Sequence, residues 1–393
     1  MKNFKILLLL ALINFTNILD FMVMMPLGPQ LKRTFDLGPS EWSLLIASYA
    51  LSAFVSGVAA IFFIDKFDRK KFLLITYVFF IFGTFLCAIA ESYEALLFGR
   101  IIAGIFGGTI ASVVLAIVGD TTPPEKRATA MGIVMAGFSA AAALGVPFGI
   151  YFGTLYNWHM PFYAIVVLGV ITTAMIYFII PNITSHIAVG GKISGWTNIK
   201  KSFADKNQLI ALLFMVVILF GQFSIIPFLS PYMVANVGFT ENDLLYIYLF
   251  GGILSIFTSA IIGKLSDKFG KLRVFTILLF LSLIPIIIVT NLGQTPLGIV
   301  LFVTTLFFIF AGGRMIPATA IVLSTAPPQS RGAFMSIRSA VQQLGAGVAG
   351  LIAGVIVVEN PDGSYSNYQY VGYIAVAMSL LSLWLIRKIV AKH

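Results

Sequence analysis

Charged side chains that lie inside long apolar segments are the residues of this chain best suited to chemistry. Asp20 lies in the first such segment, and Arg100, Arg314 and Arg338 lie in later ones. A charge near the centre of a lipid bilayer costs about 2.5–3.5 kcal/mol on insertion scales, so it needs water, a partner or neutralisation by a proton. Asp20 is therefore a candidate proton carrier. The alternative is a structural carboxylate that pairs with a neighbouring helix.

The arginines need a different explanation, because arginine keeps its charge in any environment and a buried one needs an acceptor or an anionic substrate. A coupling or substrate role is favoured for Arg100 over a purely interhelical bond, and both interpretations stay open for Arg314. Arg338 is interpreted as a side chain that snorkels to the membrane edge. Because Asp20 is the only deep carboxylate, these arginines favour a neutral or anionic substrate over a strongly cationic one.

The composition of the chain requires a membrane as its solvent. Charged residues make up 10% of the 393 residues and hydrophobic residues 59%, and the mean hydropathy is +0.99. A typical soluble domain has about 25% charged residues. Apolar runs of about 20 residues can cross the hydrocarbon core, and they lack the alternation of a β-barrel, so an all-α membrane protein is predicted. Twelve transmembrane helices are predicted near residues 6–27, 42–64, 72–90, 95–119, 128–150, 160–180, 208–230, 243–263, 273–292, 296–323, 333–358 and 369–387.

Lysine and arginine gather in loops that would lie on one side of the membrane. Of the 25 basic residues, 20 lie in these loops or near the termini, whereas the opposite loops hold only Lys32 and Arg33. Because cytoplasmic loops are enriched in Lys and Arg, both termini are predicted to be cytoplasmic, in a multi-pass protein of the inner membrane. This topology explains the net charge of +10, so binding to nucleic acid is not expected.

The residue combinations for several other kinds of chemistry are absent from the sequence. The three histidines, at positions 159, 186 and 393, are too scattered to form a metal cluster or a catalytic triad. The chain has no phosphate-binding loop, and the polar segment 181–207 is too short for a nucleotide-binding domain. We therefore expect no cofactor, no metal and no enzyme activity.

An internal repeat organises the chain. The charged heptad DKFDRKK at 65–71 returns 202 positions later as DKFGKLR at 267–273, and MMPLGPQL at 24–31 matches IIPFLSPYM at 225–233, which aligns Pro29 with Pro231. A duplicated unit with an even number of helices gives both copies the same orientation. The prediction is therefore two pseudo-symmetric six-helix bundles, 1–180 and 208–393, joined by a cytoplasmic linker, 181–207.

These features resemble the major facilitator superfamily, and within it the bacterial drug-and-sugar efflux transporters that exchange substrate for protons. The resemblance covers essentially the whole chain. Its most specific element is the loop after the second span, although the first copy has Ile61 and Asp68 at two positions where the family pattern has glycine. The residues that match are Asp65, Lys66, Arg69, Lys70 and Lys71 in the first copy, and Gly263, Asp267, Lys268 and Gly270, followed by Lys271 and Arg273, in the second.

The resemblance implies a conformational latch in this loop that holds an outward-open state. Its physical elements are a carboxylate at a helix terminus and an arginine that bridges to a neighbouring helix. Asp120 is the expected partner of Arg69. AIVGDTTPPEKRATAM at 116–131 matches AIVLSTAPPQSRGAFM at 320–335 with an offset of 204, so the repeat mate of Asp120 is Ser324 and a one-sided latch is expected. The alternative is that these charges only set the topology. The predicted latch residues are Asp65, Arg69, Asp120, Asp267, Lys268 and Lys271.

Two further segments resemble motifs of the family. GRIIAGIFGG at 99–108 resembles a motif whose arginine, here Arg100, is linked to proton transfer. GFSAAAALGVPFGIYFG at 137–153 resembles the antiporter motif, although Val146 separates its glycine from its proline. Small residues permit close helix approach, and the expected partner is the span near 243–263, through Ser255, Ser259 and Gly263. The predicted packing residues are Gly145, Pro147 and Gly149.

A central chamber is predicted between the two bundles. At about 100° per residue, Asn14, Asn17 and Phe21 fall with Asp20 inside an arc of about 120° on one helix. Gln222 is the repeat mate of Asp20; it can hydrogen-bond a substrate but cannot carry a proton. The predicted chamber residues are Asn14, Asn17, Phe21, Gln222, Tyr246, Arg314 and Gln342, with Tyr248 as an alternative or an addition to Tyr246.

The resulting prediction is a secondary active transporter that moves a small organic compound by alternating access, with two halves rocking about a central cavity. Proton-coupled efflux is preferred, with Asp20 and Arg100 in the coupling. Proton-coupled uptake or facilitated transport is the first alternative, and a non-transporting receptor or enzyme is a remote one. The expected partners are the substrate, protons and the lipid bilayer, and the expected functional unit is a monomer.

Overall fold

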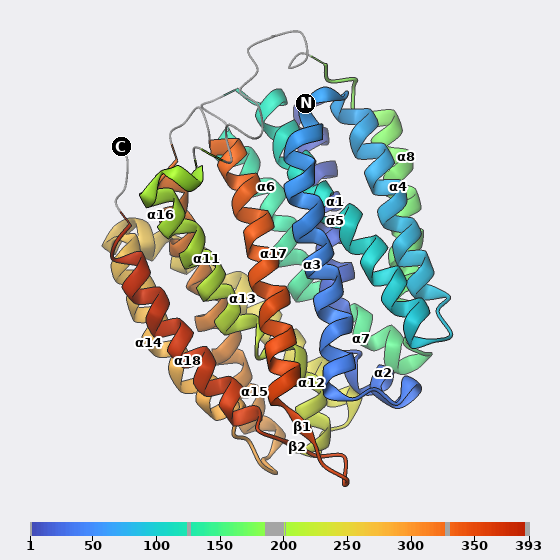
Figure 1. Ribbon diagram of the computed structural model, residues 1–393, viewed down its shortest axis with the longest axis vertical. Coiled ribbons are helices and arrows are strands. Elements are labelled where there is room, and N and C mark those ends of the chain that lie inside the picture. Colours follow the sequence, from blue (N-terminus) through green and yellow to red (C-terminus); the bar gives the residue numbers. More distant parts are fainter. Residues whose placement is uncertain (1, 124–126, 185–199, 201, 327–330, 390–393) are drawn as a thin grey trace.

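Long helices that run side by side dominate the computed structural model of the chain (Figure 1). The structure describes residues 2–123, 127–184, 200, 202–326 and 331–389. Within this part, eleven helices are long and apolar enough to cross a membrane, and the shorter apolar helix Ala143–Leu155 overlaps the end of the fifth predicted span, 128–150. The predicted all-α membrane fold is confirmed.

The first half of the chain forms the helices α1 to α8. Pro147 has no amide hydrogen to donate to the preceding turn, and the helix in front of it widens into a π-helical turn, η3. The bounds are α1 Lys2–Val23, α2 Gly28–Phe35, α3 Pro39–Phe63, η1 Ile64–Lys66, α4 Arg69–Ala88, α5 Tyr93–Thr121, α6 Arg127–Ala140, η3 Ala141–Gly145, α7 Val146–Leu155 and α8 Met160–Ile179.

The second half forms the helices α11 to α18 and a short antiparallel hairpin. In the hairpin, Val358 pairs with Ser366 and Glu359 with Tyr365. The bounds are α11 Lys206–Phe223, α12 Ile226–Ala235, α13 Glu241–Phe269, α14 Lys271–Val289, α15 Leu297–Phe307, η4 Phe308–Gly312, α16 Met315–Ser324, α17 Arg331–Ile356, β1 Val358–Glu359, β2 Tyr365–Ser366 and α18 Tyr368–Ile386.

The matching proline segments interrupt the first helix of each half at corresponding places. α1 gives way to α2, which has Pro29 in its first turn, and α11 gives way to α12, which contains Pro231. The two short helices pack against each other at the end of the molecule opposite the N-terminus (Figure 1). A Cβ atom on Gly28 would lie 2.8 Å from the Trp42 ring and 3.0 Å from Pro231, so this approach leaves no room for a side chain. We call this the α2–α12 end, and the opposite end, where α4 and α14 begin, the basic end.

Helices α3 and α17 lie along each other and form a long contact between the halves (Figure 1). Small residues allow the approach: a Cβ atom on Gly57 would lie 3.3 Å from the Ala340 Cβ, and one on Gly347 would lie 2.9 Å from the Leu51 side chain. On another side of the molecule, α13 packs against η3 and α7. Helix α17 also packs against α5, and all these contacts must change if the halves move.

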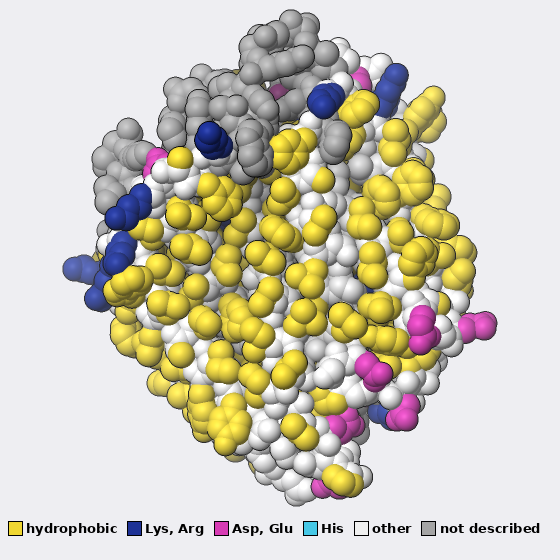
Figure 2. Space-filling view, viewed as in Figure 1, with side chains coloured by type: hydrophobic (Ala, Val, Ile, Leu, Met, Phe, Trp, Pro, Cys, Tyr) yellow, Lys and Arg dark blue, Asp and Glu magenta, His cyan; other side chains and the backbone are white. Residues whose placement is uncertain are grey.

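Figure 2 shows a broad belt of apolar side chains across the middle of one face. Lys and Arg visible on this face gather toward the basic end, and most of the visible Asp and Glu lie toward the α2–α12 end. Some apolar side chains point fully outward, such as Phe178, which is 81% exposed, and Val355, which is 79% exposed. Such a surface is suited to contact with lipid tails, and its extent agrees with a membrane-spanning fold.

Candidate proton-coupling site and the contacts between the halves

Asp20 on α1 and Arg100 on α5 form an ion pair inside the N-terminal half. Arg100 Nη1 lies 2.9 Å from Asp20 Oδ2 and also donates to the Asp20 backbone carbonyl at 3.1 Å. Both side chains are 0% exposed. The two residues predicted to take part in proton coupling are therefore in direct contact, which their separation along the chain did not reveal.

Thr84 on α4 and Tyr49 on α3 complete the surroundings of this pair. Thr84 Oγ1 donates to Asp20 Oδ1 at 2.9 Å, and the Arg100 guanidinium lies 4.5 Å from the centre of the Tyr49 ring. Asn17 Nδ2 donates to the Tyr49 hydroxyl at 3.3 Å. Arg100 Nε and Nη2 lack an oxygen acceptor in the described part of the chain. Asp20 is thus the anionic partner of the Arg100 guanidinium, which has oxygen acceptors for only some of its N–H donors.

The pair has no net charge while Asp20 is ionised. A proton that binds Asp20 removes the carboxylate charge and leaves the Arg100 charge uncompensated in the interior, where a lone charge is strongly unfavourable. One proton therefore changes the charge of this buried site by a full unit. Since Asp20 is fully buried, helices around it must also move before water reaches the carboxylate.

The polar residues predicted to share one face of α1 point in different directions. Asp20 faces α4 and α5, whereas Asn14 Nδ2 donates to the Val134 carbonyl on α6 at 3.1 Å. The Phe21 ring lies between the halves, 5.2 Å from the Tyr49 ring and 5.8 Å from the Phe223 ring on α11, measured between centres. The structure therefore does not bring these side chains together on one wall, because the neighbouring helices contact different parts of the arc.

Gln222 on α11 and Gln342 on α17 are partly exposed, although both lie within apolar spans. Within the described part of the chain neither side chain has a hydrogen-bond partner, so both amides are free to bind another molecule. Their place in a substrate chamber stays a prediction.

Tyr246 does not face the centre of the molecule, which corrects the expectation. It is 44% exposed and lies on the same face of α13 as Phe250, 47% exposed, and Phe257, 66% exposed. This stripe is suited to contact with lipid. Tyr248 lies on the opposite face of the helix, is buried, and shares a hydrogen bond of 2.9 Å with the Ser230 hydroxyl on α12. A shift of two residues turns a helical side chain by about 200°, which explains the difference.

Arg314, at the start of α16, is buried inside the C-terminal half. Its Nη1 donates to the Ser282 hydroxyl on α14 at 3.2 Å and to the Ser379 hydroxyl on α18 at 2.8 Å. Arg338 on α17 is 7% exposed, and its Nη2 donates to the Thr319 hydroxyl on α16 at 3.0 Å. The snorkelling interpretation of Arg338 is wrong, because its guanidinium lies against α16 instead of reaching water.

The predicted contact between Arg69 and Asp120 is present at the basic end. Arg69 Nε lies 2.9 Å from Asp120 Oδ2, which joins the start of α4 to the end of α5, and Arg69 Nη1 donates to the Ile64 carbonyl. The Arg69 side chain is 4% exposed, so the pair is largely shielded from solvent. The side chain of Asp65 lies outside the described residues. The role of this pair as a conformational latch stays a prediction.

The second copy of the charged loop has a different structure. Asp267, Lys268 and Lys271 are exposed, and no ion pair joins them to another side chain among the residues that the structure describes. Gly270 turns the chain from α13 into α14 with φ = 93°, a conformation that favours glycine. Asp68, at the matching position of the first copy, has φ = −56° and caps α4 by accepting from the Lys71 amide at 3.0 Å. The role of the second copy as a latch stays a prediction, and in this conformation its charged residues form no ion pair with another described side chain.

The glycines near Pro147 pack against α1. A Cβ atom on Gly145 would lie 2.7 Å from Leu19 Cδ1, and one on Gly149 would lie 2.2 Å from Val23 Cγ2. The close approach predicted for this motif is therefore present. These two glycines meet α1, while the expected span near 243–263 also packs against η3 and α7.

That span, α13, contacts α7 through larger side chains. Tyr248 packs with Val146 and Ile150, whereas no described atom lies within 4 Å of a Cβ atom placed on Gly263. Gly263 therefore takes no part in this contact, and the contribution of Ser255 and Ser259 stays a prediction. The spacing of small residues was visible in the sequence, but the faces that meet depend on the rotation of each helix.

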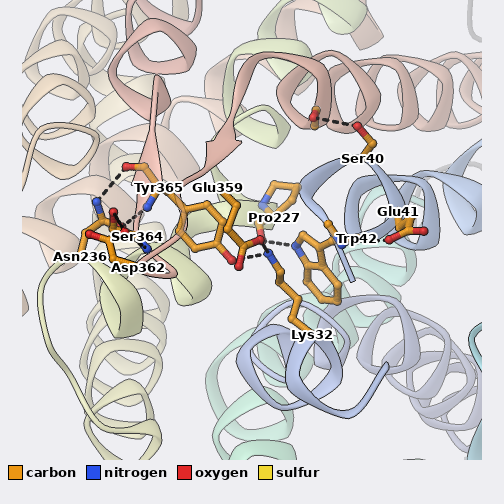
Figure 3. Close-up of polar contacts among 12 residues, drawn as sticks. Lys32, Ser40, Glu41, Trp42, Pro227, Asn236, Glu359, Asp362, Ser364 and Tyr365 are labelled. Atoms are coloured by element: carbon orange, nitrogen blue, oxygen red, sulfur yellow. Dashed lines mark hydrogen bonds and ion pairs between the residues drawn. The ribbon is translucent and has the colours of Figure 1, made fainter. Parts of the chain in front are cut away.

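A group of polar contacts at the α2–α12 end was not predicted from the sequence (Figure 3). Lys32 on α2 is 7% exposed; its Nζ lies 2.5 Å from Glu359 Oε2 on β1 and also donates to the Tyr365 hydroxyl on β2. Asn236, after α12, holds the hairpin by accepting from the Tyr365 amide and donating to its carbonyl, both at 2.8 Å. Burial lowers the pKa of the Lys32 amine, an effect that Glu359 opposes.

Further contacts close the same end between the halves. Arg33 on α2 pairs with Glu241 on α13, which also accepts from Gln30 Nε2 at 2.5 Å. Trp42 Nε1 on α3 donates to the Pro227 carbonyl on α12 at 2.9 Å (Figure 3). The only signal for these contacts in the sequence was that Lys32 and Arg33 are the sole basic residues in the loops of that side of the membrane.

Among the described residues, no three His, Cys, Asp or Glu side chains are grouped so that they could hold a metal ion.

The sequence matches the family model of the Major Facilitator Superfamily over residues 10–308 and 211–392. The MFS-type transporter YwfA of Bacillus subtilis (strain 168) is 28% identical over 373 residues, which cover 92% of this chain and 86% of that protein. Multidrug resistance protein 2 of the same strain is 23% identical over 377 residues, which cover 94% of this chain and 92% of that protein.

Solved transporter structures have the same fold. The D-xylose-proton symporter superposes with a TM-score of 0.76 at 16% identity, over 99% of this chain and 98% of that chain. A bacterial homologue of the human lysosomal transporter Spinster, in an inward-facing and occupied conformation, gives a TM-score of 0.73 at 16% identity, over 98% of this chain and 93% of that chain. Because the family match spans nearly the whole sequence and the fold agrees with it, the chain belongs to the major facilitator superfamily of membrane transporters.

Proposed function

We propose that this transporter exports a small organic compound in exchange for protons, with Asp20 as the proton carrier and Arg100 as its coupling partner. The basic end is cytoplasmic in this proposal, and the membrane is the inner membrane. The observation that carries the proposal is the fully buried Asp20–Arg100 pair, whose charge a single proton changes. The similarity to multidrug resistance protein 2 supports export as the direction.

During transport the Asp20–Arg100 pair alternates between two states, one with Asp20 protonated and one with Asp20 ionised. In the outward-open state a proton binds a carboxylate oxygen of Asp20, and the new O–H bond removes the negative charge that balances Arg100. The Tyr49 ring and the Asp20 backbone carbonyl remain as its partners, which are weaker than a carboxylate. The uncompensated guanidinium then favours a rearrangement that lets Asp20 reach cytoplasmic water and release the proton. The neutral pair re-forms, and the substrate crosses in the opposite direction.

Alternating access also requires contacts that break in turn at the two ends. Lys32, Glu359 and Tyr365 join the halves at the α2–α12 end and must separate when that end opens. Arg69 and Asp120 lie at the basic end, where the proposed latch would act. Of these two groups of contacts, only those at the α2–α12 end join the two halves, so a rocking movement that opens this end has to break them.

Everted membrane vesicles test the direction and the coupling together. Compounds that stabilise the purified protein, found among antibiotics, dyes, sugars, nucleosides and metabolite acids, would be offered to the vesicles with and without an acidic lumen. We expect uphill accumulation only with the acidic lumen, and none after a protonophore is added. Accumulation in right-side-out vesicles with an acidic exterior would instead identify a proton-coupled uptake system.

The carrier is tested by Asp20→Asn, which keeps the shape of the side chain but cannot take up a proton. We expect this variant to lose uphill accumulation and to retain exchange of substrate across the membrane. The matched control is Asp36→Asn, which makes the same chemical change at an exposed residue of the same half. Normal uphill export by Asp20→Asn would exclude Asp20 as the carrier.

A further inference from the structure

The C-terminal half contains buried positive charge that the carboxylates of this half do not balance. From residue 268 to residue 358, a stretch that forms α14 to α17, the chain has no Asp or Glu. Arg314 and Arg338 lie in this stretch, and both are buried. Since arginine does not lose its proton in proteins, a buried guanidinium without a carboxylate calls for an anion from elsewhere.

The two arginines differ in how fully they are enclosed. Arg314 is 0% exposed and contacts two serine hydroxyls of α14 and α18, so its surroundings belong to the C-terminal half. Arg338 is 7% exposed, and Gln342, one turn along the same face of α17, is partly exposed. This face points away from α3, because the α17 residues that meet α3, Ala340 and Gly347, lie on the opposite side of the helix. Arg338 is therefore the more accessible of the two arginines and the better placed for contact with a substrate.

The guanidinium of Arg338 is also incompletely bonded. It carries five N–H donors, but Nη2 has the Thr319 hydroxyl, Nη1 has only the Met335 sulfur at 3.8 Å, and Nε has no partner in the described part of the chain. Gln342, one helical turn further along α17, is partly exposed and has no partner there either. The site thus offers several donors, no acidic acceptor and a fixed positive charge.

We propose, on the basis of the transport function proposed above, that the substrate is an organic anion whose carboxylate or phosphate oxyanion binds Arg338. Thr319 and Gln342 supply further hydrogen bonds to it. The oxyanion provides the acceptors that Arg338 lacks, and planar guanidinium groups bind such oxyanions through paired hydrogen bonds. The Asp20–Arg100 pair is neutral when Asp20 is ionised, so it does not compete for the anion.

Equilibrium binding to the purified protein tests this proposal without a proton gradient. A library of organic carboxylates and phosphates, each paired with its neutral amide or alcohol, would be screened by thermal shift, and affinities of the compounds that bind would be measured by calorimetry. We expect anions to bind and their neutral counterparts to fail. Arg338→Gln should weaken anion binding about 10- to 100-fold, because a hydrogen bond to a charged group is lost. Comparing the carboxylates with the phosphates of the library shows which oxyanion binds more tightly.

Arg338→Lys is the second variant, because it keeps the charge and should retain part of the affinity if Arg338→Gln proves poorly folded. Arg273→Gln is the matched control, since it removes an exposed positive charge from the same half and should leave anion affinity unchanged. The proposal is overturned if the library yields only neutral or cationic ligands, if no compound binds, or if Arg338→Gln binds anions as well as the native protein. Proton-coupled export of a neutral compound would overturn this inference alone, whereas anion binding without proton coupling would overturn only the proposed antiport.

Discussion

In the N-terminal half, two buried arginines each have a carboxylate at 2.9 Å, Arg100 with Asp20 and Arg69 with Asp120. In the C-terminal half, Arg314 and Arg338 are also buried, but their oxygen partners in the described part of the chain are serine and threonine hydroxyls. The two halves share the proline breaks in α1–α2 and α11–α12, which occur at corresponding places, but they differ in these charges.

This difference suggests a division of tasks between two copies of one scaffold. A paired carboxylate can exchange a proton, so the N-terminal half is suited to coupling. An arginine without a carboxylate can accept an anion, so the C-terminal half is suited to substrate binding. Variants made in matching pairs, one in each half, can break or sharpen this comparison.

The largest contrast is expected between Arg100→Met and Arg314→Met. Arg100→Met leaves the Asp20 carboxylate buried without its partner, so the free energy of unfolding should fall by about 3–5 kcal/mol at neutral pH. Arg314→Met removes an unbalanced charge, so it should lower the free energy of unfolding by no more than about 1 kcal/mol, or raise it. Unfolding in mixed detergent micelles measures both. Equal losses would contradict the comparison, and adding Asp20→Asn to Arg100→Met should recover much of the loss.

A smaller contrast is expected at the basic end between Arg69→Ala and Lys271→Ala. Arg69→Ala removes a shielded ion pair and a bond to the Ile64 carbonyl, so a loss of about 1–3 kcal/mol and slower transport are expected. Lys271 is exposed, and its replacement should change the stability by less than about 0.5 kcal/mol. Transport rates and unfolding would be measured on the same preparations. If Lys271→Ala slows transport as much as Arg69→Ala, the latch is not one-sided.

Glycine packing gives the next contrast. Gly149→Ala places a methyl group 2.2 Å from Val23 Cγ2, so α7 and α1 must separate, and we expect a loss of about 1–3 kcal/mol. Gly263→Ala has free space and a better helix former, so it should be neutral or stabilising by up to about 1 kcal/mol. Thermal unfolding of the two variants is the measurement. A neutral Gly149→Ala would show that the approach of α7 to α1 is looser than described.

The smallest effect is expected from pH at the α2–α12 end. Burial lowers the pKa of Lys32 below its ordinary value of 10.5, so the closed form binds this proton less tightly than an open, hydrated form. Closure should therefore strengthen as the pH rises from the lowered pKa toward 10.5. Distances between spin labels at the exposed residues Thr34 and Val358 would report it. Lys32→Met should abolish this pH dependence of closure, and Arg33→Met should keep it. An unchanged pH dependence in Lys32→Met would show that another group is responsible.

The fold could be predicted from the sequence because its signals are local. The length of each apolar run sets a span, so the prediction of 72–90 falls within two or three residues of α4, Arg69–Ala88. Asp20 and Arg100 could be singled out for the same reason, because a charge inside an apolar run is visible without knowledge of the fold.

What the sequence left open depends on how helices rotate and meet. Tyr246 and Tyr248 differ by two positions, and only packing shows which one faces inward. The contact of Lys32 with Glu359 joins residues more than 300 positions apart through strands of two residues each, which leave no periodic pattern. Gly145 and Gly149 were recognisable as packing residues, but their partner α1 was not.

The central claim is that Asp20 takes up and releases a proton inside the N-terminal half. Infrared difference spectroscopy of the protein in liposomes, recorded during a pH cycle, tests it directly and needs no known substrate. We predict a carbonyl band of a protonated, buried carboxyl group that appears as the pH falls, persists in Asp36→Asn and is missing from Asp20→Asn. The same band in Asp20→Asn, or no such band in the native protein over the pH range in which it stays folded, would contradict the claim.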